Sequence, residues 1–514
     1  MFLQKLIRLM TSRLVITAIL IIAQLVWIAL LLLRVLDFSP AIETTLRVFS
    51  VLMALYIIKK DEVPAYRMDW VLIILVTPVF GGLLYLLAGD KRPSAWLRRR
   101  LKHGKKIHDE LLEQDEEVLL SLKNENQRVL GLFKYVAESG KFPFWKNTEI
   151  KYHNGGESHY EDMLRELKHA EHFIFLEYFI IESGKMWDTI LDILVERAAA
   201  GVDVRLIYDD MGCVTRISSN YHKRLEAIGI RALSFNRVIP FVSAVMNNRD
   251  HRKIMVIDGN TAFTGGLNLA DEYINITSPF GHWKDSGVML KGDAVWGFTV
   301  MFLEMWNSFR PTDTDFDCFR PSLCGNTKND GFIQPFSDSP LDGETVSLNV
   351  YLDILAQAKR YVYIFTPYLV ISDELQLALC QAAKRGVDVR IAIPGIPDKK
   401  LTYRLSRSYY SPLRRAGVKI YEYTPGFIHA KSYVSDDEIA VVGTINMDYR
   451  SLYLHFECGV LMYGCPIIGD IRDDAIATFA VSREVHLRDR NKGPVLNFLG
   501  ALLDSVLRVF ATLF

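Results

Sequence analysis

The chain has 514 residues, half of them hydrophobic, and its basic and acidic residues balance, so the formal net charge is zero. A chain of this length can form more than one domain with its own hydrophobic core. The zero net charge provides no general attraction to nucleic acid, so no nucleic-acid partner is expected. The six cysteines are scattered without a Cys-x-x-Cys pair, which favours reduced thiols over a disulfide framework or a zinc site.

Residues 1–90 predict a membrane anchor. Residues 14–33 and 70–88 are uncharged runs, each long enough to cross a hydrocarbon core as a helix. Basic residues precede the first run and follow the second, and such flanks usually stay cytoplasmic, so two crossings are favoured. The run 48–58 is shorter and is interpreted as interfacial or re-entrant, with a third span over about 45–58 as the alternative. We therefore expect a multi-pass protein of the plasma membrane with its remaining domains in the cytoplasm.

Residues 91–132 form a basic and then charged segment, predicted to be a helical linker. Its basic part either binds anionic lipid head groups or only fixes the membrane topology. Beyond it, residues 133–320 and 321–490 echo each other, and both contain the pentapeptide Gly-Val-Asp-Val-Arg, at 201–205 and 386–390. Each half has the order strand, helix, glycine turn, strand, which predicts a repeated α/β domain with βαβ units.

Each half also carries one His-x-Lys-x₄-Asp motif, in the stretches HRKIMVID from His251 and HAKSYVSD from His429. In a strand, residues two apart point to the same face, so each histidine is expected to project beside its lysine. A glycine-containing turn then ends in Asn268 in the first half and in Asn446 in the second, at the same spacing. Duplicated strands with a surface His and Lys are the alternative, but a scaffold has little use for this polar pair beside apolar strand residues.

Two histidines, two lysines and two asparagines that converge at a seam between the halves would form a cationic pocket for a phosphate. Lysine supplies point charge, and asparagine supplies a neutral hydrogen-bond donor. One neutral imidazole can attack phosphorus while the other, protonated, gives its proton to the departing alkoxide. His251 is assigned as the nucleophile and His429 as the acid, an order only narrowly preferred over its reverse. No cofactor or metal is expected, because no second histidine or carboxylate lies at metal-ligand spacing near either motif histidine in the sequence.

These motifs make the chain resemble the phospholipase D superfamily and, more narrowly, the bacterial cardiolipin synthases. Similar stretches include HWKDSGVMLKG after the first motif and GFIQPFSDSP at the seam. The resemblance implies two phospholipase D-like domains with mixed sheets flanked by helices, related by a pseudo-two-fold axis. It also implies the site residues. The motif residues expected to be catalytic are His251, Lys253, Asp258, His429, Lys431 and Asp436, and those that bind phosphate or orient an imidazole are Asn268, Asn446, Asp285 and Glu457.

Within this set, Asp258 and Asp436 fall at strand ends, where a structural role is favoured over direct catalysis. The implied reaction joins two phosphatidylglycerols into cardiolipin and glycerol through a phosphatidyl-histidine. The alternatives are another phospholipase D-type phosphatidyltransferase, a phospholipase D hydrolase, or an inactive membrane scaffold. The implied partners are phosphatidylglycerol and membrane lipids, and the oligomeric state is left open. Many relatives have only two apolar segments, which match 48–58 and 70–88, so 14–33 is additional.

Residues 491–514 predict a C-terminal amphipathic helix, because the polar residues from Asn497 to Thr512 recur mostly on one narrow face. Asp504 and Arg508 near its middle make it a poor spanning helix. The preferred interpretation is an interfacial helix in the head-group layer, and the alternative is a helix packed on the domain core.

Overall fold

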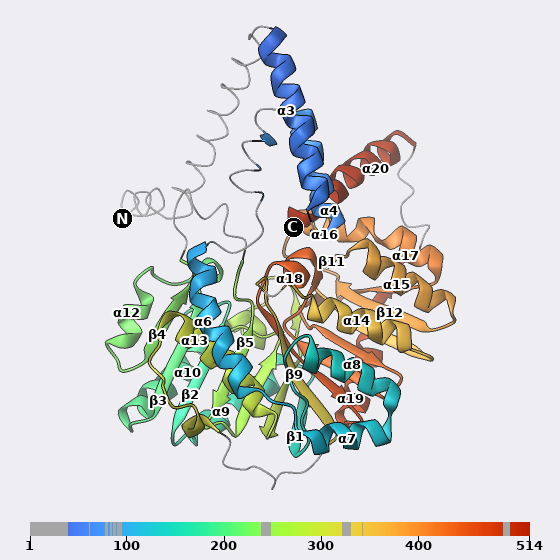
Figure 1. Cartoon of the computed structure of the whole chain (residues 1–514). Coiled ribbons are helices and arrows are strands. Elements are labelled where there is room, and N and C mark those ends of the chain that lie inside the picture. The colour runs from blue at the N-terminus through green and yellow to red at the C-terminus, as the bar shows by residue number, and fades with distance from the viewer. Residues whose placement is uncertain are drawn as a thin grey trace, which may run out of the picture.

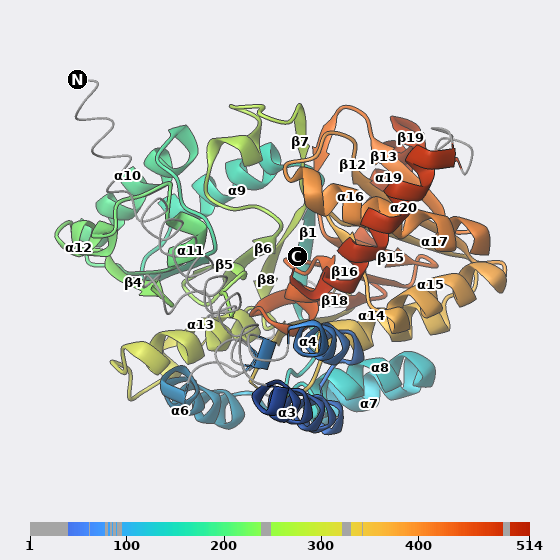
Figure 2. The ribbon, with the colours of Figure 1, turned by 90° about the horizontal axis from the view of Figure 1, so that it is seen from above.

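The computed structural model describes residues 40–60, 62–77, 81–82, 85, 89, 95–237, 248–320, 330–341, 343–486 and 494–513. The chain forms two α/β halves that lie side by side, each a mixed sheet flanked by helices (Figures 1 and 2). The repeated order of strand, helix, glycine turn and strand predicted this arrangement. The five cysteines among the described residues are free thiols, as their scattered positions suggested.

The first half contains a sheet of seven described strands in the order β1-β8-β6-β5-β2-β3-β4. Strands β2, β3 and β4 are parallel, and the other pairs are antiparallel. The strands are β1 (Thr148–His153), β2 (Phe173–Tyr178), β3 (Asp203–Asp209), β4 (Arg231–Phe235), β5 (Lys253–Ile257), β6 (Thr261–Gly265) and β8 (Gly287–Gly292). The helices are α9 (Gly156–Lys168), α10 (Lys185–Ala199), α11 (Asp210–Cys213), α12 (Tyr221–Glu226) and α13 (Val295–Phe309), with the 3₁₀ turns η1 (Asp271–Ile274) and η2 (Asp317–Phe319).

The second half contains a sheet of eight described strands in the order β19-β13-β12-β10-β15-β16-β18-β9. The strands are β9 (Phe332–Asp338), β10 (Tyr361–Phe365), β12 (Asp388–Pro394), β13 (Lys419–Tyr423), β15 (Ser432–Ser435), β16 (Ile439–Gly443), β18 (Glu457–Tyr463) and β19 (Ser482–Glu484). The helices are α14 (Val346–Gln357), α15 (Asp373–Lys384), α16 (Lys400–Ser408), α17 (Tyr410–Ala416), α18 (Tyr449–Tyr453) and α19 (Ile467–Ala480), and β11 (Leu369–Val370) pairs with β17 (Met447–Asp448).

The repeated pentapeptide has the same structural role in both halves. It follows the crossover helix, α10 or α15, and leads into a strand parallel to the one before that helix. Its glycine, Gly201 or Gly386, has a φ of 97° or 95°, in the left-handed region that favours glycine. The sequence repeat therefore reports a repeated βαβ unit.

Two backbone contacts join the halves beside the motif histidines. Strand β7 (His282–Lys284) of the first half pairs in parallel with β14 (Gly426–Ile428) of the second. At the other contact, Asp250 forms an isolated parallel bridge with Phe456. The largest hydrophobic cluster also includes residues of both sheets, such as Phe175 and Val362. A shared core and paired backbone fix one half against the other.

The N-terminal region differs from the predicted anchor. Its described helices are α3 (Pro40–Lys59), α4 (Pro64–Val76), α6 (Ala95–Leu111), α7 (Glu116–Glu125) and α8 (Gln127–Glu138). Among the described residues, none of the helices combines the length and apolar character that a membrane crossing requires. The predicted span 70–88 is interrupted, because α4 ends at Val76 before Pro78, and proline disfavours helical backbone at the residue before it. The run 48–58 lies inside the continuous helix α3 with no re-entrant turn, and the predicted span 14–33 lies outside the described residues.

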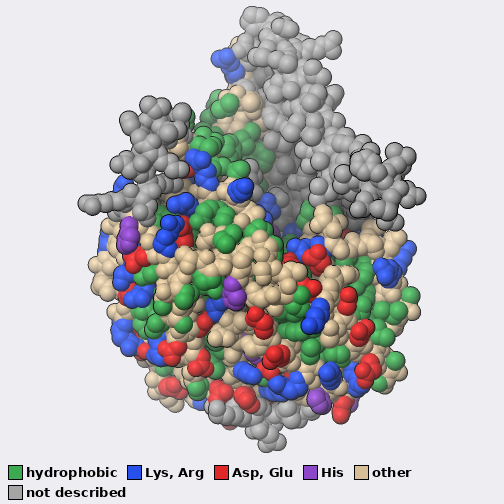
Figure 3. Space-filling view, turned by 180° about the vertical axis from the view of Figure 1, so that it is seen from behind, with side chains coloured by type: hydrophobic (Ala, Val, Ile, Leu, Met, Phe, Trp, Pro, Cys, Tyr) green, Lys and Arg blue, Asp and Glu red, His purple; other side chains and the backbone are tan. Residues whose placement is uncertain are grey.

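Helix α3 projects from the body of the molecule (Figure 1). Hydrophobic side chains gather on the projecting part, whereas the body carries mixed charges (Figure 3). The apolar residues exposed on α3 include Val48, Phe49, Leu52, Leu55 and Ile58.

The C-terminal helix α20 (Pro494–Val509) packs on α16 through its polar side chains. Asp504 accepts a hydrogen bond from Arg404 at 3.0 Å, Arg508 donates to Gln376 at 3.0 Å, and Thr512 of the following turn η4 (Ala511–Leu513) donates to Asp69. The exposed side of α20 is apolar and includes Leu502, Leu503 and Val506. The helix is therefore amphipathic, and Asp504 and Arg508 are directed toward the protein, whereas Ser505 is exposed.

Candidate active site

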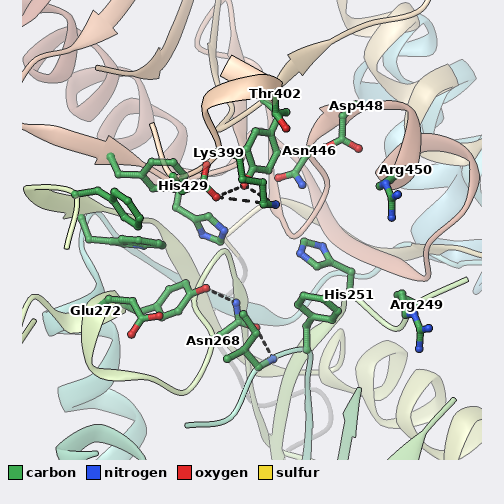
Figure 4. A pocket seen from close by; sticks show the side chains of 18 of the residues that line it. Arg249, His251, Asn268, Glu272, Lys399, Thr402, His429, Asn446, Asp448 and Arg450 are labelled. Atoms are coloured by element: carbon green, nitrogen blue, oxygen red, sulfur yellow. Dashed lines mark hydrogen bonds and ion pairs between the residues drawn. The ribbon is translucent and has the colours of Figure 1, made fainter. Parts of the chain in front are cut away.

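A cavity of about 930 Å³ lies between the halves and is lined from both of them. His251 and Asn268 come from the first half, and His429 and Asn446 from the second. Figure 4 shows the two imidazole rings facing each other across the cavity, with one asparagine on either side. The two motifs that the sequence separates therefore contribute to one site.

Each histidine is held by a carboxylate of the other half. Nδ1 of His251 lies 2.9 Å from both carboxylate oxygens of Glu457, and Nδ1 of His429 lies 2.8 Å from Oδ2 of Asp285. A carboxylate acceptor at Nδ1 keeps the proton on that nitrogen, so Nε2 is the nitrogen available for chemistry. The resemblance predicted that these carboxylates orient imidazoles, and the structure adds that the pairs cross between the halves.

The contacts between the halves place these pairs. The amide of His251 donates to the carbonyl oxygen of Phe456 at 2.9 Å, directly before Glu457. In the same way, the amide of His429 donates to the carbonyl oxygen of Lys284 at 2.7 Å, directly before Asp285. The same backbone hydrogen bond, from the amide of the histidine to the carbonyl before the carboxylate residue, thus positions each histidine.

The motif lysines lie beneath the histidines and are not among the residues that line the cavity. Nζ of Lys253 donates to the carbonyl oxygen of His251 at 2.6 Å, and Nζ of Lys431 donates to that of His429. A buried ammonium group needs an acceptor, and each lysine takes the carbonyl of its own histidine. Burial lowers the pKa of Lys253 to about 8 and that of Lys431 to about 7.

Both motif histidines are biased toward the neutral form. Burial, followed by the positive charges of Lys253 and Lys431, lowers the pKa of His251 well below its usual value. Burial and Lys431 lower the pKa of His429 to about 4, although Asp285 opposes the shift. Burial alone would raise the pKa of Asp285, but His429 and Lys431 outweigh it and lower that pKa. A bound anion would favour protonation of one imidazole, because opposite charge stabilises the cation.

The two asparagines differ in their hydrogen bonds. Oδ1 of Asn268 accepts from the amide of Ile180 at 3.0 Å, and its Nδ2 donates to the hydroxyl of Tyr273 at 2.7 Å. Oδ1 of Asn446 is buried and has no hydrogen-bond partner among the described residues. Only the second asparagine therefore presents an unsatisfied polar atom at the cavity.

The motif aspartates lie away from the cavity. Asp258 and Asp436 have φ values of 52° and 57°. Asp258 accepts from three consecutive amides, those of residues 171–173, at 2.7 to 2.9 Å, and Asp436 accepts from those of residues 359–361 at the same distances. These contacts fix the starts of β2 and β10. The two aspartates therefore do not fit the group of catalytic residues, and their contacts agree with the favoured structural role.

Sequence reasoning missed His455, which lines the cavity. Its ring centroid is 5.8 Å from that of His251. His455 lies two residues before Glu457, just as Trp283 lies two residues before Asp285, and this shared spacing was the available signal. Ligand atoms of His251, His455 and Glu457 lie within 4.8 Å of one another, so the structure supplies the metal-ligating neighbours that the sequence lacked. A metal ion there would compete with the hydrogen bonds between Glu457 and His251.

Comparisons with known proteins agree with this geometry. Residues 163–278 and 351–476 match the family described as "Cardiolipin synthase, PLD-like domain", and residues 48–89 match a "Phospholipase_D-nuclease N-terminal" segment. A cardiolipin synthase of Alkalihalophilus pseudofirmus is 34% identical over 90% of this chain and 92% of its own length. The chain belongs to the cardiolipin synthase family. It is thus an enzyme of the phospholipase D type.

Other relatives of the cardiolipin synthase family give the same result. A cardiolipin synthase of Halalkalibacterium halodurans is 30% identical over 92% of this chain and 94% of its own. An uncharacterized protein of Streptococcus mutans is 47% identical over 84% of this chain and 93% of its own. The crystal structure of phosphatidylserine synthase from Haemophilus influenzae aligns with a TM-score of 0.55 at 15% identity, over 73% of this chain and 98% of that one. This last similarity supports the fold.

Proposed function

We propose that the protein is a cardiolipin synthase, which transfers the phosphatidyl group of one phosphatidylglycerol to another and releases glycerol. The observation that carries the proposal is the pair of imidazoles facing each other across one cavity, each held at Nδ1 by a carboxylate of the other half. Membership of the cardiolipin synthase family supports the choice of substrate.

The reaction proceeds in two displacements at phosphorus. In the first, Nε2 of one neutral histidine attacks phosphorus, and the bond to the head-group glycerol breaks as the other histidine gives that oxygen a proton. In the second, the terminal hydroxyl of another phosphatidylglycerol returns a proton to the same acid–base histidine. Its oxygen then displaces the first histidine, which gives cardiolipin. Lys253 and Lys431 stabilise the charge on the phosphoryl oxygens from beneath the site.

The substrate is a lipid, so we place the enzyme at the cytoplasmic face of the cell membrane, with residues 14–33 as an anchoring segment. The uncharged character of that run and the apolar side chains exposed on α3 support this location.

The test is incubation of the purified full-length protein with phosphatidylglycerol labelled in its head-group glycerol, as the only phospholipid. We expect cardiolipin and free glycerol in equal amounts, with no requirement for an added divalent ion and no loss in EDTA. His251→Ala and His429→Ala serve as the inactive controls. Release of phosphatidic acid in place of cardiolipin would identify a hydrolase, and a rate restored after EDTA by one specific ion would contradict the metal-free mechanism.

A further inference from the structure

The two walls of the cavity differ in chemistry although the halves are related by a repeat. Around His429 there are three aromatic neighbours: ring centroids of Tyr273, Trp283 and Phe427 lie 5.3, 5.4 and 6.0 Å from that of the imidazole. His251 has one aromatic neighbour of this kind in the cavity wall, Phe179 at 5.0 Å. His455 of the second half lies beside His251, and the equivalent residue of the first half, Trp283, lies beside His429. An apolar group beside one histidine is therefore matched by a polar group beside the other.

Two arginines line the wall of the cavity on the side of His251, Arg249 before the first motif and Arg450 after Asn446 (Figure 4). Arg249 is buried, donates to the carbonyl oxygen of Asn236 at 2.8 Å and lies 3.8 Å from Asp209. The pKa of Arg450 is lowered, first by burial and also by the charge of Arg249, although Asp448 opposes the shift. The positive charges of two arginines thus act on each other at this wall.

Two further groups complete this wall. Both ring nitrogens of His455 are buried and have no hydrogen-bond partner among the described residues, although Nδ1 lies 3.8 Å from Oε1 of Glu457. A histidine ring carries a proton on at least one nitrogen, so His455 can donate a hydrogen bond to an anion in the cavity. The carboxylate of Asp448 also lines the cavity, but it accepts from the amide of Ser451 at 2.8 Å. The wall therefore places two guanidinium groups and one imidazole together at the cavity on the side of His251.

We propose that Arg249, Arg450 and His455 form a second anion subsite, which binds the phosphodiester that the acceptor lipid keeps. This inference rests on the proposed function, because a phosphatidylglycerol acceptor carries a phosphate three carbons from its attacking hydroxyl. Arginine suits a phosphodiester because its planar fork donates two parallel hydrogen bonds. The transferred phosphate lies between the two imidazoles, and the retained one lies beyond His251.

The subsite also sets the order of the chemistry. Displacement at phosphorus is in line, so the incoming hydroxyl arrives opposite the bond from phosphorus to the nucleophile. An acceptor held beyond His251 requires His429 to form the phosphorus–nitrogen bond and His251 to give and take the proton. The aromatic wall around His429 then keeps water from the phosphatidyl-histidine. This order is the reverse of the one narrowly preferred from the sequence.

The experiment compares two acceptors of the same donor, unlabelled phosphatidylglycerol. One assay measures cardiolipin, and the other measures exchange of labelled free glycerol, which has no phosphate, into phosphatidylglycerol. We expect Arg450→Gln to lower the ratio of cardiolipin formation to glycerol exchange by about tenfold or more, as expected when a charged hydrogen bond to an anion is lost. Arg450→Lys retains part of that ratio. The matched control is Arg216→Gln, because Arg216 lines the same cavity and pairs with Glu182 and with Glu272, the latter at 2.9 Å.

An unchanged ratio in Arg450→Gln, or an equal fall in the ratio in the control, would overturn the subsite. With a radioactive phosphatidyl donor, we expect label to be trapped on His429 of the His251→Ala protein. Label trapped instead on His251 of the His429→Ala protein would also overturn the subsite. Wild-type protein that exchanges glycerol but forms no cardiolipin would instead overturn the proposed function, and the subsite with it.

Discussion

The hydrogen bonds from each motif histidine to a carboxylate of the other half should control catalysis rather than folding. We expect Asp285→Asn to lower kcat by roughly 10²- to 10⁴-fold, because the amide cannot stabilise the charged imidazole or hold its tautomer. Glu457→Gln should act in the same way on His251. Steady-state rates and thermal unfolding of the purified variants measure the two effects separately.

The matched control is Asp258→Asn, since Asp258 bonds backbone amides away from the cavity. This change should lower the free energy of unfolding by roughly 2 kcal/mol while the folded fraction keeps its kcat. A loss of turnover without a loss of stability in this variant would show that the motif aspartate does act in the chemistry.

The motif lysines predict an alkaline limit to substrate binding. A cationic group with a lowered pKa carries its charge below that pKa and loses it above, so Lys431 and Lys253 lose theirs as pH rises through about 7 to 8. We therefore expect the KM for phosphatidylglycerol to rise over this interval. Lys431→Arg should move the rise to higher pH, because a guanidinium stays protonated there. A KM profile identical to that of the wild type would contradict this assignment.

At the scale of elements, helix α20 predicts an interaction with the lipid surface. The side chains of Leu502, Leu503 and Val506 are 54%, 44% and 46% exposed, while Asp504 and Arg508 bond to the protein. Changing all three to Asn should raise the KM for phosphatidylglycerol in vesicles by about a hundredfold, since each partly exposed side chain contributes roughly 1 kcal/mol to burial in lipid. Activity on a soluble short-chain phosphatidylglycerol should change little.

Ser505→Asn is the control for α20, because it changes an exposed polar position of the same helix. Vesicle binding by sedimentation, measured for both variants, checks the effect directly. Equal binding by the triple variant and the wild type would leave α20 as a helix that only packs on α16.

Local patterns in the sequence predicted the elements well and their mutual placement poorly. The βαβ repeats, the motif residues and the amphipathic C-terminal helix follow from periodicity and spacing within short stretches. The crossed carboxylates do not, because Glu457 and Asp285 meet histidines far away in the chain, and only the assembled sheets determine which half they reach. For the same reason the sequence could not tell which face of α20 would meet the protein.

For the whole molecule, the shared core predicts a single unfolding transition of the two sheets. The largest hydrophobic cluster contains buried side chains of both halves, including Trp296 and Tyr433, and β7 pairs with β14 across the boundary. Neither half should stay folded once the other has opened. Calorimetry should therefore show one main transition that coincides with the loss of activity, and two well-separated transitions would disprove the coupling.

The crossed carboxylates also bear on how such an enzyme arises in evolution. A single half holds a histidine without the carboxylate that orients it, so the smallest working ancestor is a pair of identical halves about a two-fold axis. We infer that gene duplication and fusion kept every contact of that pair and freed its two copies to diverge. Trp283 and His455 record this divergence, since they occupy matching positions with different chemistry. A pair of identical halves must treat both of its substrates alike, whereas a fused chain can evolve a separate place for each.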